Sequence, residues 1–271
     1  MARPMKRVPF GRWLMAMALV EAWFVSSREW AGTHLFRKVV GIAHLVDPTP
    51  LASMPSFFML SAIYLTCVAL WTSGRLLPFT GAIAWIVLMI SASLEASAIG
   101  RPNPTLDVIF PLVMLGAWEV GRQIKRAGSE PERDAFAHEV VCGVLAAIFV
   151  LACTAKLSHT GMSWTDGNPL RLLVFERSFA ATPPLEDVRL AFANTPWLAR
   201  FASTYTVLVQ GAGICFLWPR ARKLWTLAVI PMFTGFAVLM GMFQVPWVLL
   251  PIALSWSTFG LSHPAKPAPV G

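Results

Sequence analysis

The chain has 271 residues, of which 56% are hydrophobic and only 13% are charged, and its mean hydropathy is +0.61. Soluble globular domains carry about 25% charged residues, so this composition excludes an ordinary soluble domain and indicates a polytopic membrane protein. The net charge of +8 does not indicate nucleic-acid binding, because the basic residues cluster beside apolar segments, as topology signals and contacts with anionic lipids do.

Apolar segments long enough to span a bilayer predict an all-α fold, a polytopic transmembrane helical bundle of about eight spans. In chain order they are residues 10 to 26, 54 to 73, 76 to 98, 105 to 121, 137 to 155, 201 to 218, 223 to 243 and 245 to 260. The alternative count is about seven, because the first carries Glu21 and the last is short and holds Pro246 and Pro251. We expect one transmembrane domain, residues 1–262, and a short Pro-rich tail, residues 263–271.

The opening segment has a basic start and an apolar stretch, as a signal peptide does, but no small-residue cleavage site follows before "SSREW". We therefore interpret it as a retained first helix with its amino terminus inside. The short inside loops then hold most of the basic residues, as the positive-inside rule requires. These are Arg3, Lys6, Arg7, Arg12, Arg75, Arg122, Lys125, Arg126, Arg133, Arg220, Arg222, Lys223 and Lys266. Both termini are predicted to be cytoplasmic.

Two long connections, residues 27 to 53 and 156 to 200, interrupt an otherwise compact layout. Connections of this length are usually functional or disordered. In the second, apolar residues alternate with charged ones at helix-like spacing, as in "PLEDVRLAFANTPWLARF". We predict amphipathic interfacial helices in this long outer loop, with a solvated loop resting on lipid as the alternative.

Ionisable residues inside apolar segments are the sharpest chemical signal, since such residues normally face the bundle and mark function or pairing. Glu95 lies late in the third segment, Asp107 early in the fourth and Lys156 at the end of the fifth. In the predicted topology all three fall toward the outer leaflet, where they are candidates for one shared cavity. Glu21 lies deeper, unless the first segment lies flat on the membrane.

Each of these residues also has a structural explanation. In the alternative interpretation, the Lys156 side chain extends from the end of its helix to the membrane interface, where the helix dipole stabilises its charge. In the same interpretation, Glu95 accepts a structural hydrogen bond at a helix end. Asp107 stabilises the amino terminus of its helix through the helix dipole. The four cysteines lie in apolar runs without metal-ligand spacing, and His34 and His44 are ten residues apart, so we expect neither a disulfide framework nor a metal site.

The stretch "ACTAKLSHTGMSWTDGNPL", residues 152 to 170, resembles the signature of the horizontally transferred transmembrane domain family, which includes the membrane part of vitamin K-dependent γ-glutamyl carboxylase. In that signature an apolar span ends in a small residue, lysine and leucine, followed by tryptophan and glycine. The matching residues are Ala155, Lys156, Leu157, Trp164 and Gly167. The layout of the spans upstream and downstream is also similar to that of the family.

The resemblance implies that Lys156 acts as a base toward a lipid-soluble hydroquinone, and that a quinone or hydroquinone is the cofactor or substrate. A desolvated amine at an apolar boundary suits that role. The family usually has a histidine early in the fourth span or in the turn before it, and "RPNPTLD" has none. Gln210 stands where the family often has glutamate, and Phe233 and Thr234 stand where it often has histidine.

Two hypotheses follow. The first is a membrane enzyme, resembling carboxylases of the lyase class, with Lys156 as the catalytic base. Its substrate-binding candidates are Glu95, Asp107, Trp164, Asp166 and Gln210, with Trp164 as a lid over the lysine. The second is a non-catalytic bundle that binds lipid or a small molecule or serves as an assembly partner. Membrane lipids are the expected partners, and the compact size indicates a bacterial inner membrane.

Overall fold

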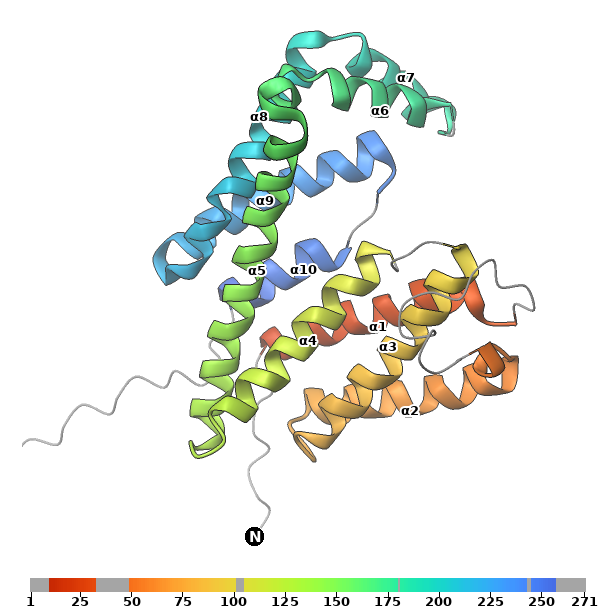
Figure 1. Cartoon of the computed structure of the whole chain (residues 1–271), viewed down its shortest axis with the longest axis vertical. Helices are drawn as coiled ribbons and strands as arrows, with labels where there is room; N and C mark the ends of the chain where they lie inside the picture. The colour runs from red at the N-terminus through yellow and green to blue at the C-terminus, as the bar shows by residue number, and fades with distance from the viewer. Residues whose placement is uncertain (1–9, 33–48, 101–104, 180, 243–244, 257–271) are drawn as a thin grey trace, which may run out of the picture. The chain divides into compact units, whose positions relative to one another are not determined.

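The computed structural model describes residues 10–32, 49–100, 105–179, 181–242 and 245–256 (Figure 1). These residues form helices and turns and contain no strand, which confirms the predicted all-α class for the described part. Each predicted span overlaps a helix. Four helical stretches are long and apolar enough to cross a membrane: Met54–Thr72, Phe79–Ile99, Glu130–Asp166 and Pro219–Met240. The larger count of about eight spans remains a prediction.

The chain divides into two compact units, which are described separately. Unit 1 comprises Met1–Val141 and Trp256–Gly271, and unit 2 comprises Cys142–Ser255. The single domain predicted over residues 1–262 stays a prediction, and the predicted tail, residues 263–271, lies outside the described residues.

Unit 1 is a helical bundle in which α1 packs against α2, α3 and α4, and α3 packs against α2 and α4 (Figure 1). Its elements are α1 (Phe10–Trp30), the short 3-10 helix η2 (Thr49–Leu51), α2 (Met54–Thr72), α3 (Phe79–Ile99), α4 (Leu106–Ile124) and the first turns of α5 (Glu130–Thr160). Met15, Ala18 and Trp23 of α1 are buried. The first segment is therefore part of the bundle rather than a helix that stands apart from it.

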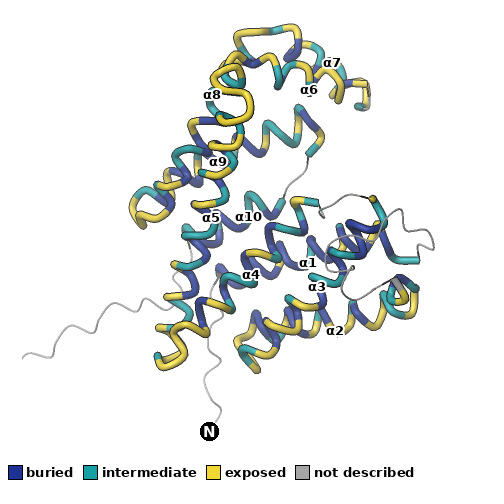
Figure 2. Tube along the Cα trace, in the orientation of Figure 1, coloured by how far each residue is buried: buried dark blue, intermediate teal, exposed yellow. Residues whose placement is uncertain are grey.

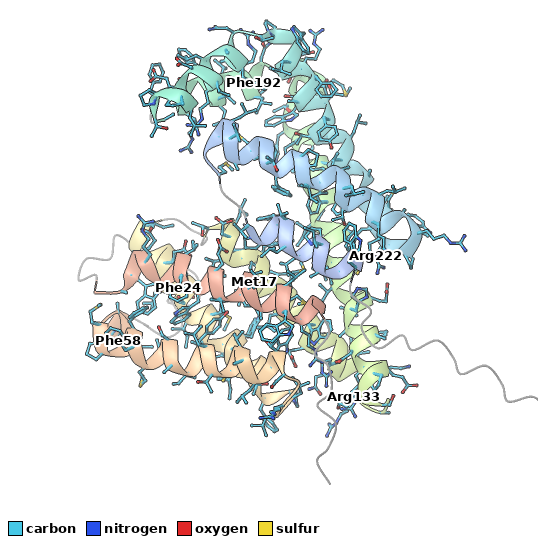
Figure 3. All side chains as sticks on the ribbon, turned by 180° about the vertical axis from the view of Figure 1, so that it is seen from behind. Met17, Phe24, Phe58, Arg133, Phe192 and Arg222 are labelled. Carbon is cyan, nitrogen blue, oxygen red and sulfur yellow. The ribbon has the colours of Figure 1, made fainter. Side chains whose placement is uncertain are left out.

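The outer faces of unit 1 are apolar as well as its interior. The tube of Figure 2 shows α2 with alternating buried and exposed positions along its length. Met17 and Phe24 of α1 and Phe58 of α2 are more than half exposed, and Figure 3 labels all three. Helices with apolar residues both inside and outside the bundle are typical of proteins whose surroundings are lipid.

Local sequence signals set the helix ends. Ser53 caps α2 by accepting a hydrogen bond from the Ser56 N–H at 3.3 Å, and Pro55 occupies the first turn, where its missing N–H costs nothing. Gly100 ends α3 and Gly241 ends α9 (Pro219–Met240) in the left-handed conformation that glycine tolerates.

Unit 2 contains the rest of α5 and the elements that follow it. These are η3 (Gly161–Asp166), α6 (Asn168–Ser178), α7 (Pro183–Ala193), α8 (Pro196–Gly211), η4 (Ala212–Leu217), α9 and α10 (Val245–Trp256). The predicted helices of the long outer loop correspond to α6 and α7, which pack against each other. Buried Leu170, Val174, Phe192, Ala199 and Met240 join α6, α7, α8 and α9 in one apolar cluster, and Figure 3 labels Phe192. The location of α6 and α7 at a membrane surface stays a prediction.

The segment predicted as a span over residues 201 to 218 differs in detail. Its α-helix, α8, begins at Pro196 and ends at Gly211, and the remainder is the 3-10 helix η4. Within η4, Gly213 approaches α5 so closely that an added Cβ would lie 2.7 Å from the Phe149 Cβ. The change from α-helix to 3-10 helix therefore coincides with close packing of the Gly213 backbone on α5. A hydropathy profile does not predict such a change.

Candidate functional site

Lys156 lies in the last turns of α5, after the apolar part of that helix, and its side chain is half-buried. Its Nζ lies 3.5 Å from the Ala152 carbonyl oxygen, at the long limit of a hydrogen bond. The same ammonium lies 5.6 Å from the centroid of the Trp164 ring, within the range of a cation–π interaction. An ammonium carries three donors, and these contacts leave most of that capacity unused.

The loop after α5 folds back to bring Trp164 to the lysine. Gly161 and Gly167, at the two ends of η3, have φ values of +58° and +82°, in the region that favours glycine. Gly167 also rests on the backbone of α8: an added Cβ would lie 2.5 Å from the Arg200 nitrogen and 2.6 Å from the Ala199 carbonyl carbon. Only glycine fits there, so the "TDGNP" turn fixes the position of η3 against α8.

Trp164 contributes a second donor. Its indole Nε1 is buried and has no hydrogen-bond acceptor among the residues that the structure describes. A buried N–H without an acceptor costs about 1–3 kcal/mol. The ammonium of Lys156 and the indole N–H of Trp164 therefore form a pair of neighbouring donors with spare capacity.

Gln210 of α8 belongs to the same unit and is 94% buried, since its exposed fraction is 6%. Its Oε1 has no donor among the described residues. The next residue, Gly211, lies beside Cys153 of α5, where an added Cβ would be 3.3 Å from the Cys153 Sγ, one helical turn before Lys156. Gln210 is therefore near the α5 segment that carries the lysine, whereas Asp166 is exposed at the end of η3.

Glu95 and Asp107 belong to unit 1, so the structure does not bring them together with Lys156 in one unit. Glu95 is fully buried on α3 and accepts a hydrogen bond from the Thr105 N–H at 3.2 Å. Asp107 lies in the first turn of α4. One oxygen of each carboxylate has no donor among the described residues, and the same holds for Glu21 of α1, which interacts electrostatically with Asp107.

Sequence reasoning missed a buried charged network in unit 1. Asp134 of α5 forms ion pairs with both Arg12 of α1 and Arg122 of α4, and each arginine is only 4% exposed. The Arg12 guanidinium lies 5.8 Å from the ring centroids of both Trp71 and Trp118. The sequence pattern predicts both arginines in inside loops, whereas the structure buries them between helices. Their position at the ends of apolar segments is the sequence signal for this network.

Glu119 of α4 is the second residue that was missed, although it lies inside the predicted fourth span. Its Oε1 accepts a hydrogen bond from the Trp71 indole N–H at 2.9 Å, while its Oε2 is buried without a donor among the residues described. Arg122 and Arg12 both attract its charge. An ionisable residue within an apolar span normally marks function or pairing, and this rule identifies Glu119 from the sequence alone.

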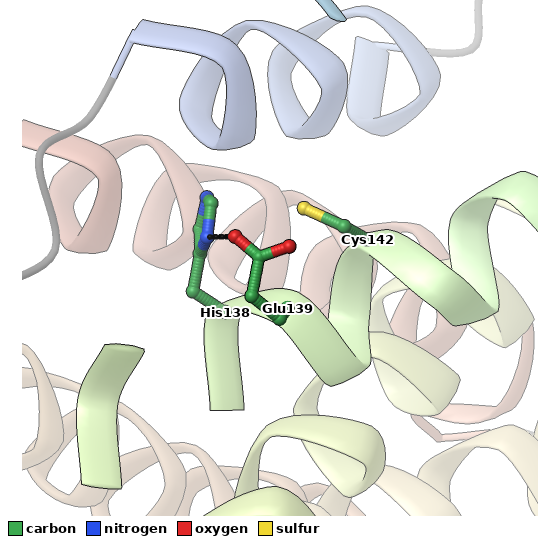
Figure 4. Close-up of side chains that lie close together, drawn as sticks. All are labelled: His138, Glu139 and Cys142. Atoms are coloured by element: carbon green, nitrogen blue, oxygen red, sulfur yellow. Dashed lines mark hydrogen bonds and ion pairs between the residues drawn. The ribbon is translucent and has the colours of Figure 1, made fainter. Parts of the chain in front are cut away.

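His138, Glu139 and Cys142 lie close together along α5, and their potential ligand atoms are within 4.8 Å of one another (Figure 4). The His138 Nδ1 and the Glu139 Oε1 are 3.1 Å apart. All three residues belong to one helix, and an exposed carboxylate such as that of Glu139 commonly lies near other polar groups without holding an ion. We assign no metal site to them.

The six predicted residues therefore separate by unit: Lys156, Trp164, Asp166 and Gln210 belong to unit 2, and Glu95 and Asp107 belong to unit 1. Within unit 2, the pair of Lys156 and Trp164 is suited to a molecule that carries hydrogen-bond acceptors. No protein-family model, curated protein or solved structure matches the chain. The resemblance stated above thus rests on the sequence around Lys156, and the function has to be inferred from the geometry.

Proposed function

We propose that the protein is an integral membrane protein that binds a lipid-soluble molecule through an acceptor-bearing head group, a carbonyl or a phosphate, at Lys156 and Trp164. The single observation that carries this proposal is the pair of neighbouring donors with spare capacity. The four long apolar helices support the membrane location.

The physical argument begins with the cost of leaving the donors unsatisfied. Within unit 2, no described acidic side chain forms an ion pair with Lys156, and no described residue accepts a hydrogen bond from the Trp164 indole N–H. A ligand oxygen that accepts from both groups removes the desolvation cost of the indole and gains a charge-assisted hydrogen bond, which is stronger than a neutral one. A phosphate oxygen and a quinone carbonyl share this chemistry.

Substitution of Lys156 is expected to weaken binding of both kinds of head group. Suitable probes are decylubiquinone, which presents carbonyl oxygens, and lysophosphatidylglycerol, which presents a phosphate. Lys156→Met keeps the length of the side chain but removes the charge-assisted hydrogen bond, so we expect the Kd in detergent micelles to rise about tenfold or more. Trp164→Phe keeps the ring but removes the N–H, and about a fivefold rise is expected.

The matched control is Lys223→Met at the start of α9, where the lysine is exposed. It removes the same charge and should leave both Kd values unchanged. If Lys156→Met folds and binds both probes as tightly as the parent does, Lys156 only snorkels and the proposed site is wrong.

Catalysis is the second candidate function, and one observation favours it. A lysine that acts as a base must not be held as an ammonium by a carboxylate, and Lys156 has no such partner among the described residues of unit 2. As a quinone-linked enzyme the protein would use Lys156 to remove a proton from a hydroquinone hydroxyl. Lys156→Arg separates the two functions, because arginine keeps the charge but does not give up its proton. Retained binding with lost formation of the bound hydroquinone monoanion, followed by its ultraviolet absorbance, supports catalysis, and unchanged formation of the anion in the arginine variant excludes Lys156 as the base.

The proposed topology has both termini in the cytoplasm and residues 157 to 199 outside. Asn168 is exposed at the start of α6, and Arg126 is exposed in the turn between α4 and α5. A cysteine placed at Asn168 is expected to react with a membrane-impermeant maleimide from the outer side of intact cells, and a cysteine at Arg126 only after the membrane is opened. The opposite pattern would overturn this topology and the proposed bacterial inner-membrane orientation.

A further inference from the structure

An apolar groove of about 570 Å³ lies in unit 1 between α3 and α4. Ala82, Trp85 and Ile86 line it from α3, and Val113 and Glu119 line it from α4. Its volume is in the range of sites that hold small molecules, about 300–1,000 Å³. Glu119 is the single ionisable residue of the described lining.

The polar atoms of the groove wall are paired with one exception. The Trp85 indole N–H donates to the Leu112 carbonyl at 3.1 Å, and Gly116 makes room for this ring, since an added Cβ would lie 2.9 Å from the Trp85 Nε1. The Glu119 Oε1 accepts from the Trp71 indole at 2.9 Å. The Glu119 Oε2 is the exception, because it is buried and has no donor among the residues described.

The surroundings hold Glu119 in place. Its carboxylate packs over Gly81 of α3, where an added Cβ would overlap the Oε1. Arg12 and Arg122 attract its charge and form ion pairs with Asp134, but among the described residues neither donates a hydrogen bond to the Oε2. The Oε2 is thus a buried carboxyl oxygen without a donor among the described residues, directly behind the apolar wall that Glu119 helps to line.

We propose that this groove binds an amphiphile whose hydrocarbon body ends directly in a hydrogen-bond donor, a hydroxyl or an amino group, and that the donor is recognised by the Glu119 carboxylate. The apolar wall takes the hydrocarbon body. A hydrogen-bond donor on the ligand removes the free-energy cost of leaving the Glu119 Oε2 without a partner. A ligand without a donor does not remove that cost. A fatty acid is disfavoured, because its carboxylate brings a like charge to Glu119.

Photolabelling tests this proposal with four probes of equal chain length, each carrying a diazirine in the chain: an amine, an alcohol, a fatty acid and a methyl ester. In the full-length protein in nanodiscs, the amine and the alcohol are expected to label peptides from α3 and α4 at least about tenfold more than the ester, which accepts but does not donate. Glu119→Gln keeps an acceptor for Trp71 and removes the charge, so the preference for the amine should fall about tenfold.

Two variants separate occupancy of the groove from general contact with lipid. Ala82→Trp fills the groove from an exposed position on α3 and should abolish labelling by every probe, whereas Ala62→Trp, at an exposed position on α2 outside the groove lining, should not. Equal labelling by the ester and the amine in the parent would overturn the proposal even if Glu119→Gln does not fold. Labelling that Ala82→Trp leaves unchanged would overturn it as well.

The groove belongs to unit 1 and the Lys156 pair to unit 2, so the two proposals fail separately. Lys156→Met is expected to leave the photolabelling of α3 and α4 unchanged. Glu119→Gln is expected to leave the Kd for decylubiquinone at the Lys156 site unchanged.

Discussion

Replacing Asp134 with asparagine is expected to destabilise the protein by about 3–5 kcal/mol, because breaking a buried ion pair leaves an uncompensated charge behind. Asp134 is 16% exposed and is the carboxylate that Arg12 and Arg122 share. Of the two arginines, Arg122 retains a second ion pair, with Glu130 at 2.6 Å, but that carboxylate is 56% exposed. Arg12 would keep the two tryptophan rings and the Trp71 carbonyl at 3.4 Å as its neighbours.

Thermal unfolding in detergent, followed by circular dichroism, measures this effect. The matched control is Asp187→Asn at an exposed position of α7, which is expected to change stability by no more than about 0.5 kcal/mol. A double-mutant cycle with Arg12→Gln should show strong coupling, because the second substitution removes the charge that the first left without a carboxylate. Additive effects, or an Asp134 variant as stable as the control, would show that the network does not hold α1, α4 and α5 together.

Gly167→Ala is expected to have the second large effect, on both stability and ligand binding. The left-handed backbone at Gly167 costs a side-chain-bearing residue about 1–2 kcal/mol, and the overlap of the new methyl group with the α8 backbone adds about 1–3 kcal/mol. Relief of that overlap requires η3 to move away from α8, which takes Trp164 with it. The Kd for decylubiquinone should therefore rise together with the loss of stability.

Gly161→Ala is a close control for this substitution. Gly161 lies at the other end of η3 and also has a positive φ, +58°, but an added Cβ there meets nothing within 4 Å. It should show only the backbone cost of about 1–2 kcal/mol and nearly normal binding. Equal losses in the two variants would mean that the contact of Gly167 with α8 does not fix the position of Trp164.

The helices were predictable because the apolar runs are long and are bounded by residues that end helices. Gly100 after the third segment, and Pro219 before the seventh, mark boundaries that the structure reproduces closely. The change from α8 to η4 was not predictable, since it accompanies the fit of Gly213 against Phe149, a residue more than 60 positions away. Hydropathy reports how apolar a segment is and not what its backbone touches.

The candidate site was predictable in part for a similar reason. Lys156 and Trp164 are eight residues apart, so the turn glycines between and after them fix their approach locally. The grouping of Glu95 and Asp107 with Lys156 depended on packing between distant segments, and in the structure these acids belong to a different unit from the lysine. Arg12 looked like a topology signal because it stands next to a basic terminus, yet it is buried between two tryptophans.

Mass spectrometry of the intact protein, released from nanodiscs formed directly from its native membrane, tests most directly whether Lys156 and Trp164 bind a lipid-soluble molecule. We predict that the parent and Lys223→Met carry an adduct whose fragments identify a quinone or a phosphate-bearing lipid. The double variant Lys156→Met, Trp164→Phe should have lost that adduct while remaining folded. The same adduct at the same occupancy in the parent and in the double variant would contradict the proposed function.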